Sequence, residues 1–63
     1  MCESNAFMLT DDDKEELLLE DVVLLKPEPG KIVLTSILGE TRELEARIDH
    51  IDLLHHRIYL RKT

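Results

Sequence analysis

The sequence predicts a small all-β protein, a barrel of about six or seven short strands formed by one domain that spans residues 1–63. Its apolar residues come in short runs separated by turn-forming or charged clusters, which is typical of short strands. Apolar and charged residues also alternate, as in Arg57-Ile58-Tyr59-Leu60-Arg61. Such alternation places the apolar side chains on one face of a strand and the charged ones on the other.

The N-terminal part of the chain predicts two strands separated by a turn. Residues 6–9 carry apolar side chains on both faces of an extended segment, which ends at the acidic cluster Thr10–Lys14. The composition of this cluster indicates a turn. The second expected strand is Leu17–Leu19. Glu20 and Asp21 then form an expected charged turn, which discourages unwanted pairing at strand edges.

The clearest reversal of the chain lies between Val22–Leu25 and Lys31–Ile37. The intervening Lys26-Pro27-Glu28-Pro29-Gly30 contains two prolines, which remove backbone donors, and a glycine that can adopt a positive φ. The pattern therefore predicts a β-hairpin.

The C-terminal part predicts one further strand and a second hairpin. Apolar and charged residues alternate over residues 44–48, which predicts a strand with one apolar face. The hairpin is expected to have Ile51 and Leu53 on its first arm, a polar turn at residues 54–56 and residues 57–61 on its second arm.

A helix is the competing interpretation of Asp11–Lys26. This segment has acidic residues at its start, a lysine at its end and Pro-Gly just beyond it, all of which suit a helix. A helical stripe also fits Leu44, Ile48, Ile51 and Ile58. The β-branched isoleucines and the alternation on either side nevertheless favour strands.

Size and cysteine content suggest a partner subunit and a location. A domain of 63 residues buries only about 60% of the surface of its unfolded chain, so a homodimer is expected. One cysteine cannot close an intramolecular disulfide, and the N-terminus does not resemble a signal peptide. We therefore expect a cytoplasmic protein. No apolar run approaches the roughly 20 residues that cross a bilayer.

The charge and the motifs argue against two functional classes. A net charge of −6 repels phosphate backbones, and Phe7 and Tyr59 are too few aromatic residues for a base-stacking platform. Nucleic-acid binding is therefore disfavoured. The hydroxyl residues lie in no nucleophile elbow, no glycine-rich phosphate loop is present, and so small a core leaves little room for a substrate pocket. The protein is not expected to be an enzyme.

Cys2 is the residue with the most informative chemistry. Its thiol lies one position from the α-amino group of Met1, so a short segment offers an amine nitrogen, a deprotonated backbone amide and a thiolate. Nickel and copper bind strongly to nitrogen and sulfur donors in a square-planar field. Met1-Cys2-Glu3 is thus chemically suited to Ni²⁺. The alternative is a free cysteine without a function.

The segment Met1-Cys2-Glu3-Ser4-Asn5-Ala6-Phe7 resembles the opening of the CooT family of small nickel-binding proteins, first associated with maturation of the nickel enzyme carbon monoxide dehydrogenase. The likeness extends over essentially the whole chain, through the acidic turn, Pro29-Gly30 and the closing stretch Ile51–Leu60. This resemblance implies an Sm-like or SH3-like barrel that forms a homodimer. It also implies that Cys2 carries the metal, and that two such cysteines meet near the dimer axis.

The expected function is therefore that of a nickel-binding protein, a metallochaperone or nickel-handling accessory protein for enzyme maturation. Nickel(II) is expected to bind the Cys2 thiolate and nitrogen donors of Met1 and Cys2, with the Glu3 amide as a further donor. A nickel-enzyme client is an expected partner, although the family name does not identify it. An Sm-like RNA-binding protein and a metal-free protein interaction module remain alternatives.

Two further clusters of side chains are expected to be structural. His50, His55 and His56 could ligate a metal, but neighbouring residues of a strand point to opposite faces. We interpret the adjacent pair as polar turn residues and His50 as an exposed strand residue. The acidic residues Asp11, Asp12, Asp13, Glu15 and Glu16 lack EF-hand spacing, which favours a solvated turn.

Overall fold

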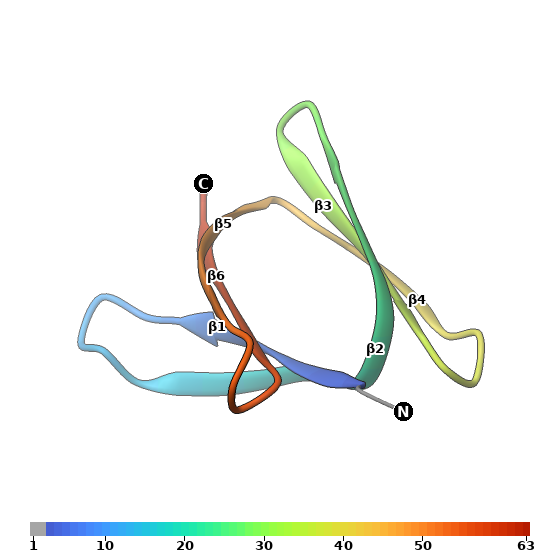
Figure 1. The fold of residues 1–63 in the computed structure, drawn as a ribbon. Helices are drawn as coiled ribbons and strands as arrows, with labels where there is room; N and C mark the ends of the chain where they lie inside the picture. Colours follow the sequence, from blue (N-terminus) through green and yellow to red (C-terminus); the bar gives the residue numbers. More distant parts are fainter. Residues whose placement is uncertain (1–2) are drawn as a thin grey trace.

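The computed structural model describes residues 3–63, and within them the chain forms a single sheet of six strands (Figure 1). The hydrogen-bonded order of the strands is β4-β3-β2-β1-β6-β5, and every pair is antiparallel except β1 with β6. The strands are β1 (Ser4–Leu9), β2 (Glu15–Glu28), β3 (Lys31–Ser36), β4 (Thr41–Leu44), β5 (Ala46–Asp52) and β6 (Arg57–Lys62). The all-β prediction is confirmed, and the helical interpretation of residues 11–26 is wrong because this part of the chain is a turn followed by a strand.

The sheet curls but does not close, so the expected barrel is an open sheet. Figure 1 shows the strands wrapping around a common interior. The edge strands β4 and β5 are joined by Glu45 alone. A connection this short cannot reverse the chain, because even the tightest hairpin needs a two-residue loop. The two strands therefore follow one another, with β4 paired to β3 and β5 paired to β6.

The largest error of the sequence prediction concerns the long strand β2. The segments 17–19 and 22–25 belong to one strand of 14 residues, and Glu20-Asp21 is a bend inside it instead of a turn. Asp21 has φ 55°, a left-handed conformation that aspartate tolerates better than most residues. Two hydrogen bonds fix it: Asp21 N–H donates to Asn5 Oδ1 (3.2 Å) and Ile37 N–H donates to Asp21 O (2.8 Å).

The bend lets one strand serve two partners. Residues 15–22 of β2 pair with β1, and residues 22–28 pair with β3. Irregularities of register lie on both sides of Val22, where such bulges increase the local twist. The sheet therefore changes direction at this point.

The turns agree better with prediction than the strand boundaries do. Pro29-Gly30 forms the reversal between β2 and β3, with Gly30 at φ 74°. The predicted turn at residues 10–14 is also present and is closed by a hydrogen bond from Thr10 N–H to Lys14 O (3.0 Å). The expected strand 44–48 is instead divided at Glu45 between β4 and β5, and Leu53 lies in the last turn, residues 53–56, instead of on an arm.

The core lies on the inner side of the curled sheet. Alternate residues of β3 are buried, as the strand period of two requires. The residues with the least exposure come from three different strands, and Ala6, Leu34 and Leu60 are fully buried. The cluster that they share is completed by Leu19, Val22, Ile32, Ala46 and Ile58. Within residues 3–63 no helix is long and apolar enough to cross a membrane.

Replacing Leu34 by alanine is expected to destabilise the protein by about 2–5 kcal/mol, because the truncation removes buried apolar surface and leaves a cavity. Leu38→Ala is the matched control, since Leu34 is 0% exposed and Leu38 84%; its effect should stay within about 0.5 kcal/mol. Urea unfolding followed by circular dichroism measures both. Equal losses for the two variants would contradict this assignment of the core.

Candidate functional site

The first described residue, Glu3, lines a groove on the protein surface; Met1 and Cys2, the other predicted donors, lie outside the described residues. The groove has a volume of about 370 Å³, and we call it the N-terminal groove. It is lined by Glu3, Ser4, Val22, Val23, Leu24, Leu25, Ile51, Leu53 and Ile58. The beginning of the described chain thus faces a mainly apolar surface.

Pairing on both sides holds the chain start beside this groove. Ser4 pairs with Val22 of β2. On the other side, Asn5 N–H donates to the carbonyl oxygen of His56 (3.0 Å) in the turn between β5 and β6. Glu3 therefore emerges between the bend of β2 and the last turn of the sheet.

The N-terminal groove exposes an unusual amount of apolar surface for so small a protein. Leu24 is 55% exposed and Leu53 82%, and Val23 and Ile51 are also exposed. Contiguous apolar patches of this kind mark interaction sites more often than chance exposure. The sequence contains these residues, but the register of β1 on β2 is what brings them together at the chain start.

Two of the three histidines are held by carboxylates. His55 Nδ1 lies 2.8 Å from Asp52 Oδ2, and His55 N–H donates to Asp52 Oδ1 (3.0 Å). His50 Nδ1 lies 2.6 Å from Asp49 Oδ1. The predictions are confirmed, because His55 and His56 lie in the turn 53–56 and His50 is an exposed residue of β5. No group of three or more His, Cys, Asp or Glu side chains within residues 3–63 is placed to hold a metal ion.

His50 also belongs to an aromatic stack that crosses three strands. Its ring stacks on Tyr59 of β6 at a centroid distance of 4.5 Å, and Tyr59 stacks on Phe7 of β1 at 5.7 Å. The Arg57 guanidinium lies 5.3 Å from the centre of the Phe7 ring and donates to the Tyr59 hydroxyl (3.2 Å). These rings stack on one another across neighbouring strands, so their role is structural.

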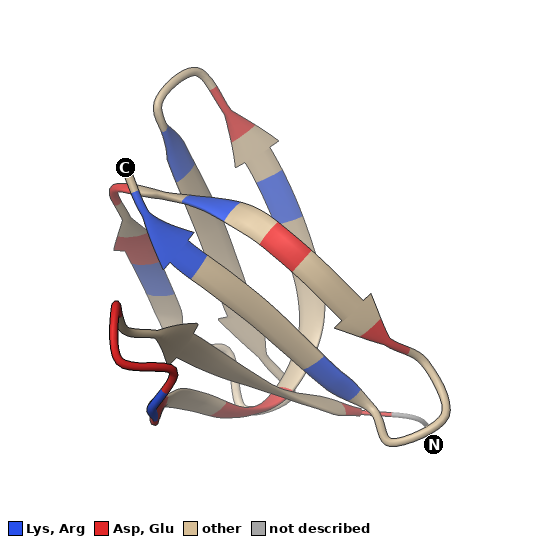
Figure 2. Cartoon of the chain, turned by 90° about the vertical axis from the view of Figure 1, so that its left-hand side faces the viewer, with Lys and Arg blue, Asp and Glu red and all other residues tan. Residues whose placement is uncertain are grey.

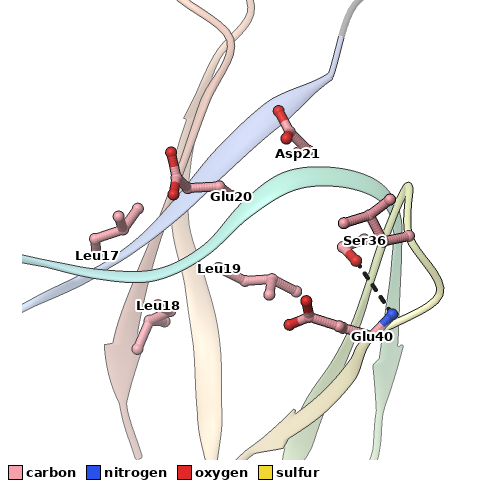
Figure 3. A pocket seen from close by; sticks show the side chains of 8 residues that line it. Leu17, Leu18, Leu19, Glu20, Asp21, Ser36 and Glu40 are labelled. Atoms are coloured by element: carbon pink, nitrogen blue, oxygen red, sulfur yellow. Dashed lines mark hydrogen bonds between the residues drawn. The ribbon is translucent and has the colours of Figure 1, made fainter.

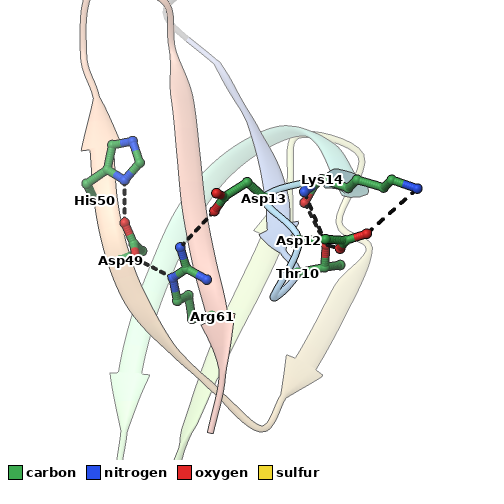
Figure 4. A network of polar contacts seen from close by, with 7 residues as sticks. All are labelled: Thr10, Asp12, Asp13, Lys14, Asp49, His50 and Arg61. Carbon is green, nitrogen blue, oxygen red and sulfur yellow. Dashed lines mark hydrogen bonds and ion pairs between the residues drawn. The ribbon is translucent and has the colours of Figure 1, made fainter.

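Arg61 of β6 connects the acidic turn between β1 and β2 to the edge strand β5. Figure 2 shows this turn as a run of acidic residues interrupted by Lys14. In Figure 4, Arg61 joins the turn to β5, because its guanidinium lies 3.6 Å from Asp13 and donates to Asp49 (2.7 Å). Asp12 accepts a hydrogen bond from the Thr10 hydroxyl (2.6 Å), which lowers the pKa of its carboxyl group. The solvated-turn interpretation is confirmed for Asp11, Asp12 and Asp13, whereas Glu15 and Glu16 are exposed residues of β2.

Comparison with known proteins relates this chain to one family. The family model described as CO dehydrogenase accessory protein CooT matches residues 1–61. A crystal structure described as CooT from Carboxydothermus hydrogenoformans superposes with a TM-score of 0.91 at 39% identity, covering 98% of each chain. An uncharacterized protein of Methanothermobacter thermautotrophicus is 37% identical over 60 residues, which is 95% of this chain and 88% of that protein. Another, from Archaeoglobus fulgidus, is 40% identical over 42 residues, 67% of this chain and 93% of that one.

The Asp–His pairs predict a loss of stability in acid. Hydrogen bonds from His50 and then Arg61 lower the pKa of Asp49, and those from His55 lower the pKa of Asp52. A carboxyl group whose pKa is lower in the folded state stabilises the fold at pH values above its pKa in the unfolded state, near 3.8. This stabilisation disappears as the pH falls through its pKa in the folded state. The melting temperature should therefore decrease as the pH is lowered below about 4.

Asp49→Asn tests this origin of the acid sensitivity. The variant should melt below the parent at about pH 6, and the difference in melting temperature should narrow at a strongly acidic pH, as the Asp49 carboxylate takes up its proton. Asp11→Asn, at an exposed turn position, is the control and should follow the parent at both pH values. If the difference in melting temperature between the parent and Asp49→Asn does not change with pH, the ionised carboxylate of Asp49 does not contribute to stability.

Proposed function

Since this chain belongs to the family of CO dehydrogenase accessory proteins described as CooT, we propose that it carries Ni²⁺ for the maturation of a nickel enzyme. The ion is held by the Cys2 thiolate and by nitrogen donors of Met1 and Cys2, with the Glu3 amide as a further donor. These atoms fit nickel, because thiolate and amide nitrogen suit a square-planar divalent ion. The role is that of a metallochaperone or nickel-handling accessory protein, and it is non-catalytic and cytoplasmic.

The position of Glu3 carries this proposal. Glu3 lines the N-terminal groove together with the exposed Val23, Leu24, Ile51 and Leu53, and Cys2 precedes it directly in the sequence. A second copy that covers this groove shields the metal from solvent and from competing ligands. In a two-fold dimer the same patch meets itself, which brings both chain starts toward the axis.

An RNA-binding function has less support. The net charge is −6, and a phosphate backbone requires a basic face. The aromatic rings of Phe7, Tyr59 and His50 stack on one another, so their faces are partly used within the sheet. A metal-free interaction module is the remaining alternative, and metal titration distinguishes it directly.

Nickel titration of the reduced, untagged protein tests the donor set. We expect a thiolate-to-nickel charge-transfer band, a Cys2→Ser variant about 100-fold or more weaker in affinity, and weaker binding at low pH because the thiol must lose a proton. A few residues added before Met1 should also weaken binding, since they remove the amine donor while the sheet is unchanged.

The His55→Ala variant is the matched control for this titration. His55 lies in the turn 53–56, and its imidazole is held by Asp52 at the end of β5. We expect the nickel affinity of the variant to equal that of the parent. An unchanged affinity in Cys2→Ser would refute the metal site, and a loss in His55→Ala alone would move the site to the turn.

The dimer is tested by a pair of matched leucines. Leu53 and Leu38 are 82% and 84% exposed, both in turns, but only Leu53 lines the N-terminal groove. Leu53→Glu should convert the dimer to a monomer in sedimentation at micromolar concentration, because it places a charge in a desolvated interface. Leu38→Glu should stay dimeric, and a monomer in both variants or in neither would contradict the proposed interface.

A further inference from the structure

A second hollow lies on a different part of the sheet, between the first half of β2 and the turn that joins β3 to β4 (Figure 3). Its volume is about 330 Å³, and we call it the edge hollow. Its lining consists of Leu17, Leu18, Leu19, Glu20, Asp21, Ser36, Leu38 and Glu40. None of these residues lines the N-terminal groove.

The hollow exists because half of β2 has a neighbour on one side only. The strand β3 pairs with residues 22–28 of β2 and leaves residues 15–20 without a strand on that side. Two carbonyl groups there are already bonded, Leu18 O by Arg42 Nη1 (2.7 Å) and Asp21 O by Ile37 N–H (2.8 Å). A segment that docks here is therefore held mainly by its side chains.

Apolar side chains form the accessible walls of the edge hollow. Leu17 is 52% exposed and Leu38 84%, whereas Leu19 is buried at its floor. Figure 3 shows the Leu19 and Glu40 side chains facing the same space below β2. The volume lies at the lower limit of small-ligand pockets, so it suits one inserted apolar side chain.

The rim of the edge hollow carries negative charge without compensation. Glu20, Asp21 and Glu40 are exposed, and within residues 3–63 none of them forms an ion pair with a lysine, arginine or histidine. Acidic residues elsewhere differ: Asp49 pairs with Arg61, and Glu43 pairs with Lys31. Figure 3 shows Glu20 and Asp21 on one side of β2 and Glu40 on the other, so exposed carboxylates border the hollow on both sides of the strand.

We propose that the edge hollow docks a basic, extended segment of a partner protein. An apolar side chain of that segment packs against Leu17, Leu19 and Leu38, and lysine or arginine residues beside it pair with the carboxylates of the rim. Charge complementarity selects this occupant. The second copy is proposed to cover the mainly apolar N-terminal groove; at the acidic rim of the edge hollow, a chain with a net charge of −6 is a poorer match than a basic segment. The proposal does not depend on nickel binding.

The test uses a short fluorescein-labelled peptide in which lysine alternates with leucine, titrated with the metal-free protein and followed by fluorescence anisotropy. The variant Glu20→Lys combined with Glu40→Lys should bind it about tenfold more weakly or worse. The control Asp11→Lys combined with Glu45→Lys has the same change of charge, at positions that line a different hollow, which shares only Leu18 with the edge hollow. Its affinity should change less than about twofold.

Two further measurements locate the contact. Leu38→Ser should weaken peptide binding while its melting temperature stays that of the parent, because its side chain is exposed. In nuclear magnetic resonance spectra, the amides that shift on peptide addition should be those of residues 17–21 and 36–40. Cys2→Ser should bind the peptide as the parent does, so failure of the nickel proposal and failure of this one are distinguishable.

Several results would overturn the proposal. If the parent protein does not bind the basic peptide, the proposed docking site is refuted. Equal weakening in both double variants shows attraction by net charge alone. A change from dimer to monomer in the Glu20→Lys and Glu40→Lys variant shows that a second copy occupies the hollow.

Discussion

The left-handed bend at Asp21 is the constraint on which the rest of the structure depends. It is held by Asn5 from β1 and by Ile37 beyond β3, so it joins three strands at one point. Because β2 changes direction there, its first half pairs with β1 and its second half pairs with β3. Each half is left with one free edge, and these edges border the N-terminal groove and the edge hollow.

Both candidate surfaces are therefore products of the same bend, although their chemistry differs. The N-terminal groove is mainly apolar and includes Glu3 in its lining, which suits the proposed symmetric contact between two copies. The edge hollow combines leucines with unpaired carboxylates, which suits a partner of opposite charge. The two proposals therefore use separate surfaces, the N-terminal groove for a second copy and the edge hollow for a basic segment of a partner.

The sequence predicts the local features of this fold well and the long-range ones poorly. Pro29-Gly30 and Thr10–Lys14 form the expected turns because their own residues determine them. Glu20-Asp21 also has the composition of a turn, yet it bends a continuous strand. The difference is made by Asn5, which is distant in sequence and contacts Asp21 only in the folded sheet. The donor atoms of Met1-Cys2-Glu3 can be proposed from sequence chemistry, whereas the groove that Glu3 lines depends on how β1 pairs with its neighbours.

The parallel pairing of β1 with β6 has a consequence for how the protein is made. These strands are far apart in the chain, and their contact runs from Asn5 with Arg57 to Leu9 with Arg61. A ribosome delivers β1 early, but this strand gains its second neighbour only after residue 61 has been synthesised. Contacts of such long sequence separation form late in folding. A truncated product that lacks β6 therefore has β1 paired along one edge instead of two, and its sheet exposes an unpaired strand edge.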